Sequence, residues 1–329
     1  MRTPKRQRKL SEAVEGFILF RRAEGISPST IKIYEWTFRH LSEFLKGEDP
    51  VLSSLHKEDI QRFYLWLQTE YKPSRKNRDT SRLTPSSIEK VWSTLRSFYH
   101  WAVEELGVDR ADTLIKRPKY KPREIAPFTE DEVRLLLKHC ATTREAYTKS
   151  RTSFIMRRPT AHRDVAIILL LLDTGLRVSE CARLKVKDVN TNTGEVFVDA
   201  FGTGQKTKSR HVYLGKKALK ALWRYLADRE DLRDTDPLFL SQTDVPMNKN
   251  SIRLMLNELG ARAGVRGVHP HRFRHTFAIQ YLRNHGDIFT LQRLLGHSTL
   301  AMVQHYLSIA AADVQETHCQ ASPADRWHI

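Results

Sequence analysis

The chain has 329 residues, of which 40% are hydrophobic, so it is long for a single core and has enough apolar residues for two domains. Its 55 Lys and Arg residues against 38 Asp and Glu give a net charge of +17, which indicates a polyanionic partner such as nucleic acid. The three cysteines lie far apart and no apolar run approaches the length of a membrane span, which argues against a disulfide framework, a cysteine zinc site and a membrane protein.

The first hundred residues predict four short helices. Ser11 is expected to cap a helix that runs toward Glu24, and Ser27-Pro28 to start the second, because proline suits the first helical position. The third helix covers about Lys57 to Glu70, and the fourth begins at Thr84-Pro85. Each has apolar residues at helical spacing, so we expect a compact bundle.

A basic segment follows the bundle. Lys116 to Arg123 places two prolines among five positive charges and cannot sustain a helix. We interpret it as an inter-domain linker that runs beside phosphates, with a merely solvated linker as the alternative. The expected boundaries are 1–112 for the helical domain, 113–127 for the linker, 128–309 for a second domain and 310–329 for a C-terminal tail.

The second domain opens with a helix signal. Thr129 and Glu132 have the spacing of a capping box and predict a helix through Cys140. Residues 141–162 are basic and weakly patterned, and we interpret them as a loop insertion. The apolar run from Asp164 to Asp173 predicts a helix that stops at Thr174-Gly175.

A hairpin is predicted next. Glu195 to Ala200 alternates as a strand does, Arg210 to Leu214 resembles a second strand, and two glycines lie between them. The rest of the chain is helical. The expected helices are Lys216 to Arg229, Asn250 to Ala263, Pro270 to Asn284, Ile288 to Leu295 and Ser298 to Leu307. The fold class is therefore mainly α with a small antiparallel β-sheet: a helical domain followed by an α+β domain.

Polar residues that could take part in catalysis gather near the C-terminus. His271 and Arg274 are three apart, so they share one face of a helix. Gly296 suits the left-handed position past a helix end, and Ser298 can cap the next helix. His297 is therefore held in a tight turn, and Tyr306 follows nine residues later.

These segments resemble the second signature of the tyrosine recombinase (phage integrase) family. The family pattern is His-x-x-Arg, then His or Trp, then Tyr. Here it reads Pro270-His-Arg-Phe-Arg-His-Thr-Phe-Ala278, Leu294-Leu-Gly-His-Ser298 and His305-Tyr306. Thr174-Gly-Leu-Arg-Val-Ser-Glu180 resembles the first signature and supplies Arg177. The family also places a lysine on a β-hairpin, which Lys206 fits best, with Lys208 as the alternative.

The resemblance implies a function and a set of catalytic residues. The N-terminal helices resemble the family's SAM-like core-binding domain, and the second domain its catalytic domain. The implied activity is site-specific DNA recombination, in which Tyr306 forms a 3′-phosphotyrosyl link. The implied catalytic residues are Arg177, Lys206, His271, Arg274, His297 and Tyr306. Glu180 is expected to steady the site through hydrogen bonds.

Partners and location follow from the same resemblance. It implies double-stranded DNA as substrate, a homotetramer on DNA, a tail that exchanges between protomers, and no metal or cofactor. We expect a cytoplasmic, nucleoid-associated protein. The insertion at 141–162 favours the recombinase of a transposon, plasmid or other mobile element, with a chromosome-dimer resolvase as the alternative.

Simpler interpretations exist for each residue taken singly. Arg177 alone would be a surface cation, and Tyr306 alone a half-buried tyrosine. A metal site at His269, His271 and His275 lacks a third suitably spaced ligand and a catalytic Glu. The alternatives for the whole chain are a catalytically silent DNA-binding protein and a topoisomerase-like enzyme that nicks and reseals DNA.

Overall fold

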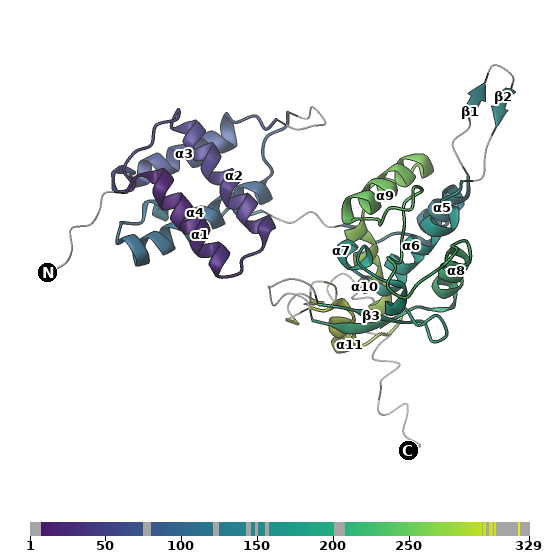
Figure 1. Ribbon diagram of the computed structural model, residues 1–329. Coiled ribbons are helices and arrows are strands. Elements are labelled where there is room, and N and C mark those ends of the chain that lie inside the picture. The colour runs from purple at the N-terminus through teal and green to yellow at the C-terminus, as the bar shows by residue number, and fades with distance from the viewer. Residues whose placement is uncertain are drawn as a thin grey trace. The chain divides into compact units, whose positions relative to one another are not determined.

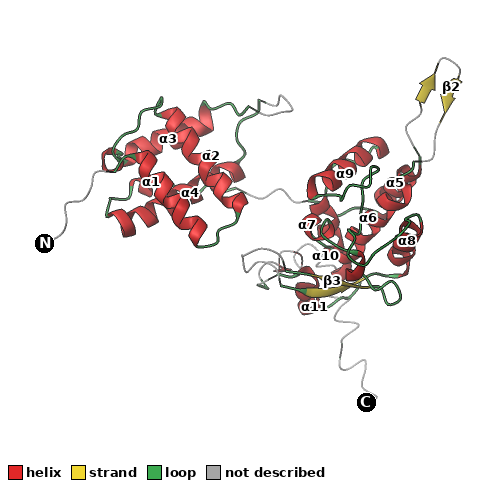
Figure 2. Ribbon diagram, in the orientation of Figure 1, coloured by secondary structure: helices red, strands yellow, loops and turns green. Residues whose placement is uncertain are grey.

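The computed structural model describes residues 8–74, 80–120, 125–142, 146–148, 151–154, 158–200 and 208–297, together with 299–300, 303–304, 306 and 322. The described residues form two compact units, one from the chain up to Arg123 and one from Glu124 onward (Figure 1). Both units are built mostly of helices (Figure 2), which confirms the expected fold class. Within the described ranges, no helix combines the length and apolar character needed to cross a membrane.

The N-terminal unit is the expected four-helix bundle. Its helices are α1 (Leu10–Ala23), α2 (Pro28–Phe44), α3 (Lys57–Thr69) and α4 (Pro85–Leu106), with short 3-10 turns at Leu52–Ser54 and Ala111–Leu114. Aromatic rings fill its core: Phe17 lies 5.5 Å from Phe98 in an edge-to-face arrangement. The fourth helix has 22 residues, so it is longer than the short helix expected from the sequence.

Of the four helix starts expected in this unit, those at Ser27-Pro28, Lys57 and Thr84-Pro85 are confirmed. The Ser27 hydroxyl accepts from the Thr30 N–H, and Thr84 caps α4 in the same way. The prediction for Ser11 is wrong, because α1 already begins at Leu10. The Ser11 N–H and hydroxyl donate instead to the carboxylate of Asp49, at 2.9 and 2.7 Å. A partner from the loop after α2 thus replaces the local cap.

The second unit surrounds one buried helix. Its helices are α5 (Glu130–Ala141), α6 (Ala161–Thr174), α7 (Val178–Cys181), α8 (Lys216–Ala227), α9 (Lys249–Ala263), α10 (Pro270–Arg283) and α11 (Ile288–Leu295), with a 3-10 turn at Val186–Asp188. Helix α6 packs against α5, α8 and α10, and Ile167, Ile168 and Leu171 on it are fully buried. The capping box of Thr129 and Glu132 at the start of α5 is confirmed.

Two small antiparallel hairpins complete the described structure. The predicted one pairs β3 (Glu195–Val198) with β4 (Arg210–Tyr213), with Val196 opposite Val212. The other pairs β1 (Ala146–Thr148) with β2 (Arg151–Phe154). The interpretation of residues 141–162 as a loop is therefore wrong in part, and α6 begins three residues before the expected Asp164. Threonine and aromatic residues favour strands here, but the interspersed charges hid the alternation.

Candidate active site

The end of α6 shapes the turn that carries Arg177. Gly175 ends the helix with φ 61°, as expected of a left-handed position, and a Cβ there would collide with the ring of Phe277. Arg177 then precedes α7. Its backbone N–H donates to Glu180 Oε2 at 2.8 Å, and its Nη1 donates to Glu180 Oε1 at 3.1 Å. The expected contact between Arg177 and Glu180 is present.

Glu180 is shared between two arginines. Arg210, the first residue of β4, donates from Nη1 to Oε1 at 3.2 Å and from Nη2 to Oε2 at 2.9 Å. Burial alone raises the pKa of Glu180, but Arg210 and then Arg177 outweigh it and hold that pKa below its usual range. Sequence analysis missed Arg210, because an isolated arginine at a strand start carries no local signal.

Arg274 lies at the centre of the site and is 5% exposed. Its Nη1 donates to the Gly175 carbonyl at 2.8 Å, and its Nη2 to the Leu295 carbonyl at 2.7 Å. The same Nη2 lies 2.7 Å from His297 Nε2. Burial, and next Arg177, lower the pKa of Arg274 to about 10, so it stays a cation at neutral pH. These bonds join the end of α6 to the end of α11.

His297 is neutral in this arrangement. Burial, followed by the charges of Arg274, Arg177 and Arg210, lowers its pKa to about 4. A guanidinium can only donate, so Nε2 must accept and the ring proton must lie on Nδ1. That Nδ1 is buried and has no hydrogen-bond partner among the residues that the structure describes. Gly296 has φ 63°, which confirms the expected left-handed turn.

Tyr306 lies against two histidine rings. Its ring centroid is 6.5 Å from that of His297, with the planes nearly parallel, and 5.2 Å from that of His275. Burial raises the pKa of Tyr306, although Arg274 and Arg177 oppose the shift. The residue is therefore a phenol at neutral pH and requires a proton acceptor before it can act as a nucleophile.

The other residues singled out from the sequence lie in different settings, and one of them lies outside the described residues. His271 is exposed in the first turn of α10; partial burial, and then His269 and Arg274, lower its pKa. His269 caps α10, since its Nδ1 accepts from the Arg272 N–H. Lys206 and the tail at 310–329, apart from Ser322, lie outside the described residues. Lys208 is described, is exposed, and precedes β4 by two residues.

Arg272 is a second arginine that sequence analysis missed. Its Nε donates to the Ala126 carbonyl at 3.0 Å, its Nη2 to Glu132 at 2.7 Å, and it lies 4.0 Å from the centre of the Phe128 ring. These contacts fasten the start of the second unit to α10. Arg272, two residues before Arg274, therefore has a structural role.

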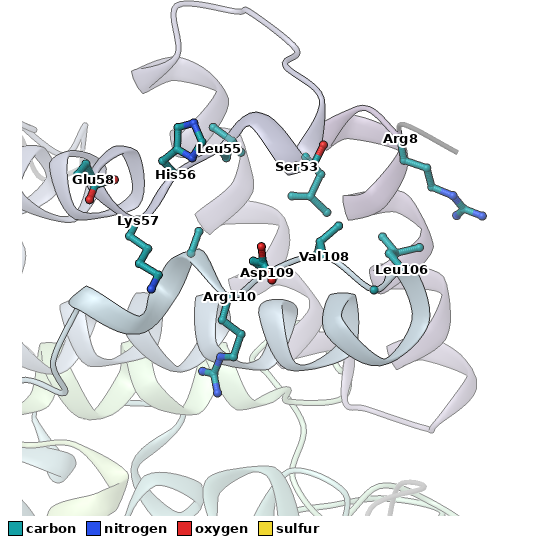
Figure 3. A pocket seen from close by; sticks show the side chains of 13 residues that line it. Arg8, Ser53, Leu55, His56, Lys57, Glu58, Leu106, Val108, Asp109 and Arg110 are labelled. Atoms are coloured by element: carbon teal, nitrogen blue, oxygen red, sulfur yellow. The ribbon is translucent and has the colours of Figure 1, made fainter. Parts of the chain in front are cut away.

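A separate pocket lies on the N-terminal unit, where the start of α3 approaches the end of α4 (Figure 3). Its volume is about 540 Å³, and Arg8, Lys57 and Arg110 contribute to its lining. Arg110 is paired with Asp112. The residues of the recombinase signatures lie in the other unit, so we assign this pocket no part in the chemistry.

Comparison with known proteins identifies relatives of both units. Residues 126–313 match the phage integrase family, and residues 14–107 match the phage integrase N-terminal SAM-like domain. Tyrosine recombinase XerC of Leptospira interrogans is 28% identical over 96% of this chain and 95% of its own. Tyrosine recombinase XerC of Halalkalibacterium halodurans is 30% identical over 93% and 96%.

Among solved structures, the Tn1549 transposon integrase in complex with transposon right end DNA has the same fold. Its TM-score is 0.68 at 18% identity, over 95% of this chain and 99% of the other. The family match covers more than half of the chain and contains the residues gathered in the site. The chain therefore belongs to the phage integrase family, the tyrosine recombinases.

Proposed function

We propose that this recombinase cuts and rejoins double-stranded DNA with Tyr306 as the nucleophile. The observation that carries the proposal is the convergence of Arg177, Arg274, His297 and Tyr306 from four separate segments on one place. Each of these residue types has a task in attack on a phosphodiester. The phosphorane charge must be stabilised, the leaving oxygen protonated, and the nucleophile held in line.

The two arginines stabilise the phosphate. A guanidinium stays charged and offers bidentate donors to the non-bridging oxygens. Arg274 is fixed by carbonyls on both sides, so its position is set before DNA arrives. Such preorganisation lowers the cost of reorganising the site in the transition state.

The histidines complete the phosphate site and handle the tyrosine proton. His297 carries its proton on Nδ1, and this buried donor suits a phosphate oxygen. His271 has a lowered pKa and is neutral at pH 7, so it can accept the phenol proton as Tyr306 attacks phosphorus. The attack forms the tyrosyl O–P bond and breaks the bond to the 5′-oxygen.

A lysine of the hairpin before β4 protonates the leaving oxygen. We assign this task to Lys206, with Lys208 as the alternative. The free 5′-hydroxyl of a partner strand then attacks the phosphotyrosine, and the phenol leaves. Bond energy is kept in the covalent link, so the cycle requires neither ATP nor a metal ion.

The assembly that we propose is a homotetramer on two DNA duplexes. Strand exchange needs four cleaved strands, and each protomer supplies one tyrosine. The two units, the expected domains 1–112 and 128–309, hold one duplex, with the linker 113–127 along the backbone and the tail 310–329 contacting a neighbour. Such an enzyme works in the cytoplasm, at the nucleoid. We favour integration or excision of a mobile element, since the chain carries the hairpin insertion after α5.

Recombination between two labelled duplexes tests this proposal. Candidate sites come from DNA flanking the gene, and the reaction contains EDTA and no ATP. We expect hybrid products of defined length. Relaxation of supercoiled DNA without hybrid products would favour the topoisomerase-like alternative. Binding with neither product would favour a silent DNA-binding protein.

A further inference from the structure

The guanidinium of Arg210 is enclosed by protein acceptors. Its side chain is 8% exposed. Both Nη atoms donate to the carboxylate of Glu180, and Nε donates to the Leu294 carbonyl at 2.6 Å. One side chain thus joins the first residue of β4 to α7 and to the end of α11.

The same guanidinium packs under the turn that presents His297. A Cβ on Gly296 would lie 3.0 Å from Arg210 Nη1 and 3.2 Å from Nε. The next carbonyl of the turn, that of Leu295, is taken by Arg274. Two arginines therefore satisfy the last carbonyls of α11, which have no partner within the helix.

We propose that Arg210 is a positioning residue, which fixes Arg177 and His297 relative to each other and to the start of β4, and does not contact the phosphate. This inference rests on the proposed function of the site. The comparison with Arg177 supports it. Arg177 is 25% exposed and donates to Glu180 from Nη1. The described bonds of Arg274 to carbonyls start from Nη1 and Nη2, whereas Arg210 directs Nε, Nη1 and Nη2 to the protein.

The charge of Arg210 also controls how strongly Glu180 holds Arg177. Each oxygen of this buried carboxylate accepts one bond from Arg177 and one from Arg210. Without Arg210, the carboxylate is compensated by Arg177 alone, which then pairs with it more tightly. An arginine drawn toward Glu180 is less available to the phosphate, so loss of Arg210 slows cleavage even though Arg177 is intact.

Single-turnover cleavage of a nicked suicide duplex at saturating enzyme tests the inference. The variants are Arg210→Ala, Arg210→Lys and Arg163→Ala. Arg163 is the matched control: it is buried, donates to the carboxylate of Asp164 and to the Leu240 carbonyl, and is no part of the site. Melting temperature and DNA affinity are measured on the same preparations.

We expect Arg210→Ala to cleave about 100-fold more slowly, the effect of misplacing catalytic groups by about 1 Å, with its Kd for DNA within about threefold of wild type. Arg210→Lys keeps the charge without the planar fork and recovers part of the rate. Arg163→Ala keeps its cleavage rate despite a lower melting temperature. If Arg210→Ala does not fold, Arg210→Lys still tests the inference. Cleavage by Arg210→Lys at the wild-type rate would contradict positioning by the planar guanidinium.

A double variant separates positioning from direct contact. Arg210→Met and Glu180→Gln are measured singly and combined, and the combination removes both charges of the buried pair. If Arg210 acts through Glu180, the double variant is no slower than the slower single variant. The inference would be overturned if the rate losses of the two single variants multiplied in the double variant. It would also be overturned if Arg210→Ala bound DNA with a tenfold weaker Kd, or if it cleaved within threefold of the wild-type rate. If the wild-type protein forms no covalent adduct with the DNA, the proposed function itself is contradicted.

Discussion

The proton on His297 is assigned by its neighbours, because Arg274 can only donate to Nε2. The ring is neutral at pH 7, since burial and three arginines lower its pKa to about 4. A neutral ring beside three cationic arginines avoids a fourth positive charge at the site. It also keeps a donor on Nδ1 for the substrate.

The lowered pKa of His297 makes the stability of the protein depend on pH. In the unfolded chain the pKa is about 6.5, so between that value and about 4 the unfolded chain binds a proton that the folded chain does not. Folding stability therefore falls as pH falls through this window. His269 and His271 contribute in the same direction.

We expect His297→Gln to lose less stability than wild type between pH 7 and pH 5, because glutamine accepts from Arg274 without titrating. The free energy of unfolding from urea titrations at both pH values measures this. A residual pH dependence from His269 and His271 is expected in the variant. Identical pH dependence in both proteins would contradict a buried, neutral His297.

The choice between Lys206 and Lys208 can be made with a modified substrate. A sulfur in place of the 5′-bridging oxygen leaves as a thiolate, which needs no general acid because a thiol has a pKa near 8.5. Substituting the acid with alanine slows cleavage of ordinary DNA about 10²- to 10⁴-fold. We expect Lys206→Ala to show this loss and to be restored by the sulfur substrate, while Lys208→Ala behaves as wild type. The reverse pattern would assign the role to Lys208.

At the scale of elements, the turn after α11 is constrained by its backbone conformation and by a neighbouring side chain. Gly296 has a left-handed backbone, and a Cβ there would lie only 3.0 Å from Arg210 Nη1. Gly264, which ends α9, has a similar φ of 69°, but a Cβ there would meet nothing within 4 Å. Substituting each glycine with alanine therefore separates the effect of backbone strain, present at both positions, from the effect of crowding, present only at Gly296.

We expect Gly264→Ala and Gly296→Ala each to lose about 1 kcal/mol of stability from the left-handed backbone. Only Gly296→Ala should also slow cleavage, because the added methyl displaces the arginine that supports the His297 turn. Thermal denaturation and single-turnover cleavage measure the two effects. Equal cleavage by the two variants would show that the contact with Arg210 is unimportant.

Local patterns predicted most elements, and long-range contacts account for the errors. The capping box at Thr129 and the glycine turns at Gly175 and Gly296 are set by neighbouring residues, so the sequence shows them. Ser11 binds Asp49, 38 residues away, and Arg210 binds Glu180, 30 residues away. Such pairs depend on how elements pack, and no spacing rule reveals them.

At the scale of the whole molecule, the net charge of +17 suits a polyanion such as DNA, and the number of phosphate contacts sets how binding responds to salt. Phosphate contacts release counterions, so affinity falls steeply as salt rises. If the two units together make six to ten phosphate contacts, affinity should fall about 10³- to 10⁵-fold between 50 and 200 mM salt. Fluorescence anisotropy with a labelled duplex measures the slope. A change below tenfold would indicate a small contact area and argue against a clamp by both units.

The most direct test of the central claim is covalent capture by Tyr306. A suicide duplex nicked beside the cleavage point is incubated with wild type or Tyr306→Phe in EDTA, and the products are separated on a denaturing gel. Removing one hydroxyl leaves the fold and the phosphate contacts, so both proteins should bind the duplex equally. We predict a protein–DNA adduct from wild type and none from Tyr306→Phe. An adduct that persists in Tyr306→Phe would show that another residue is the nucleophile.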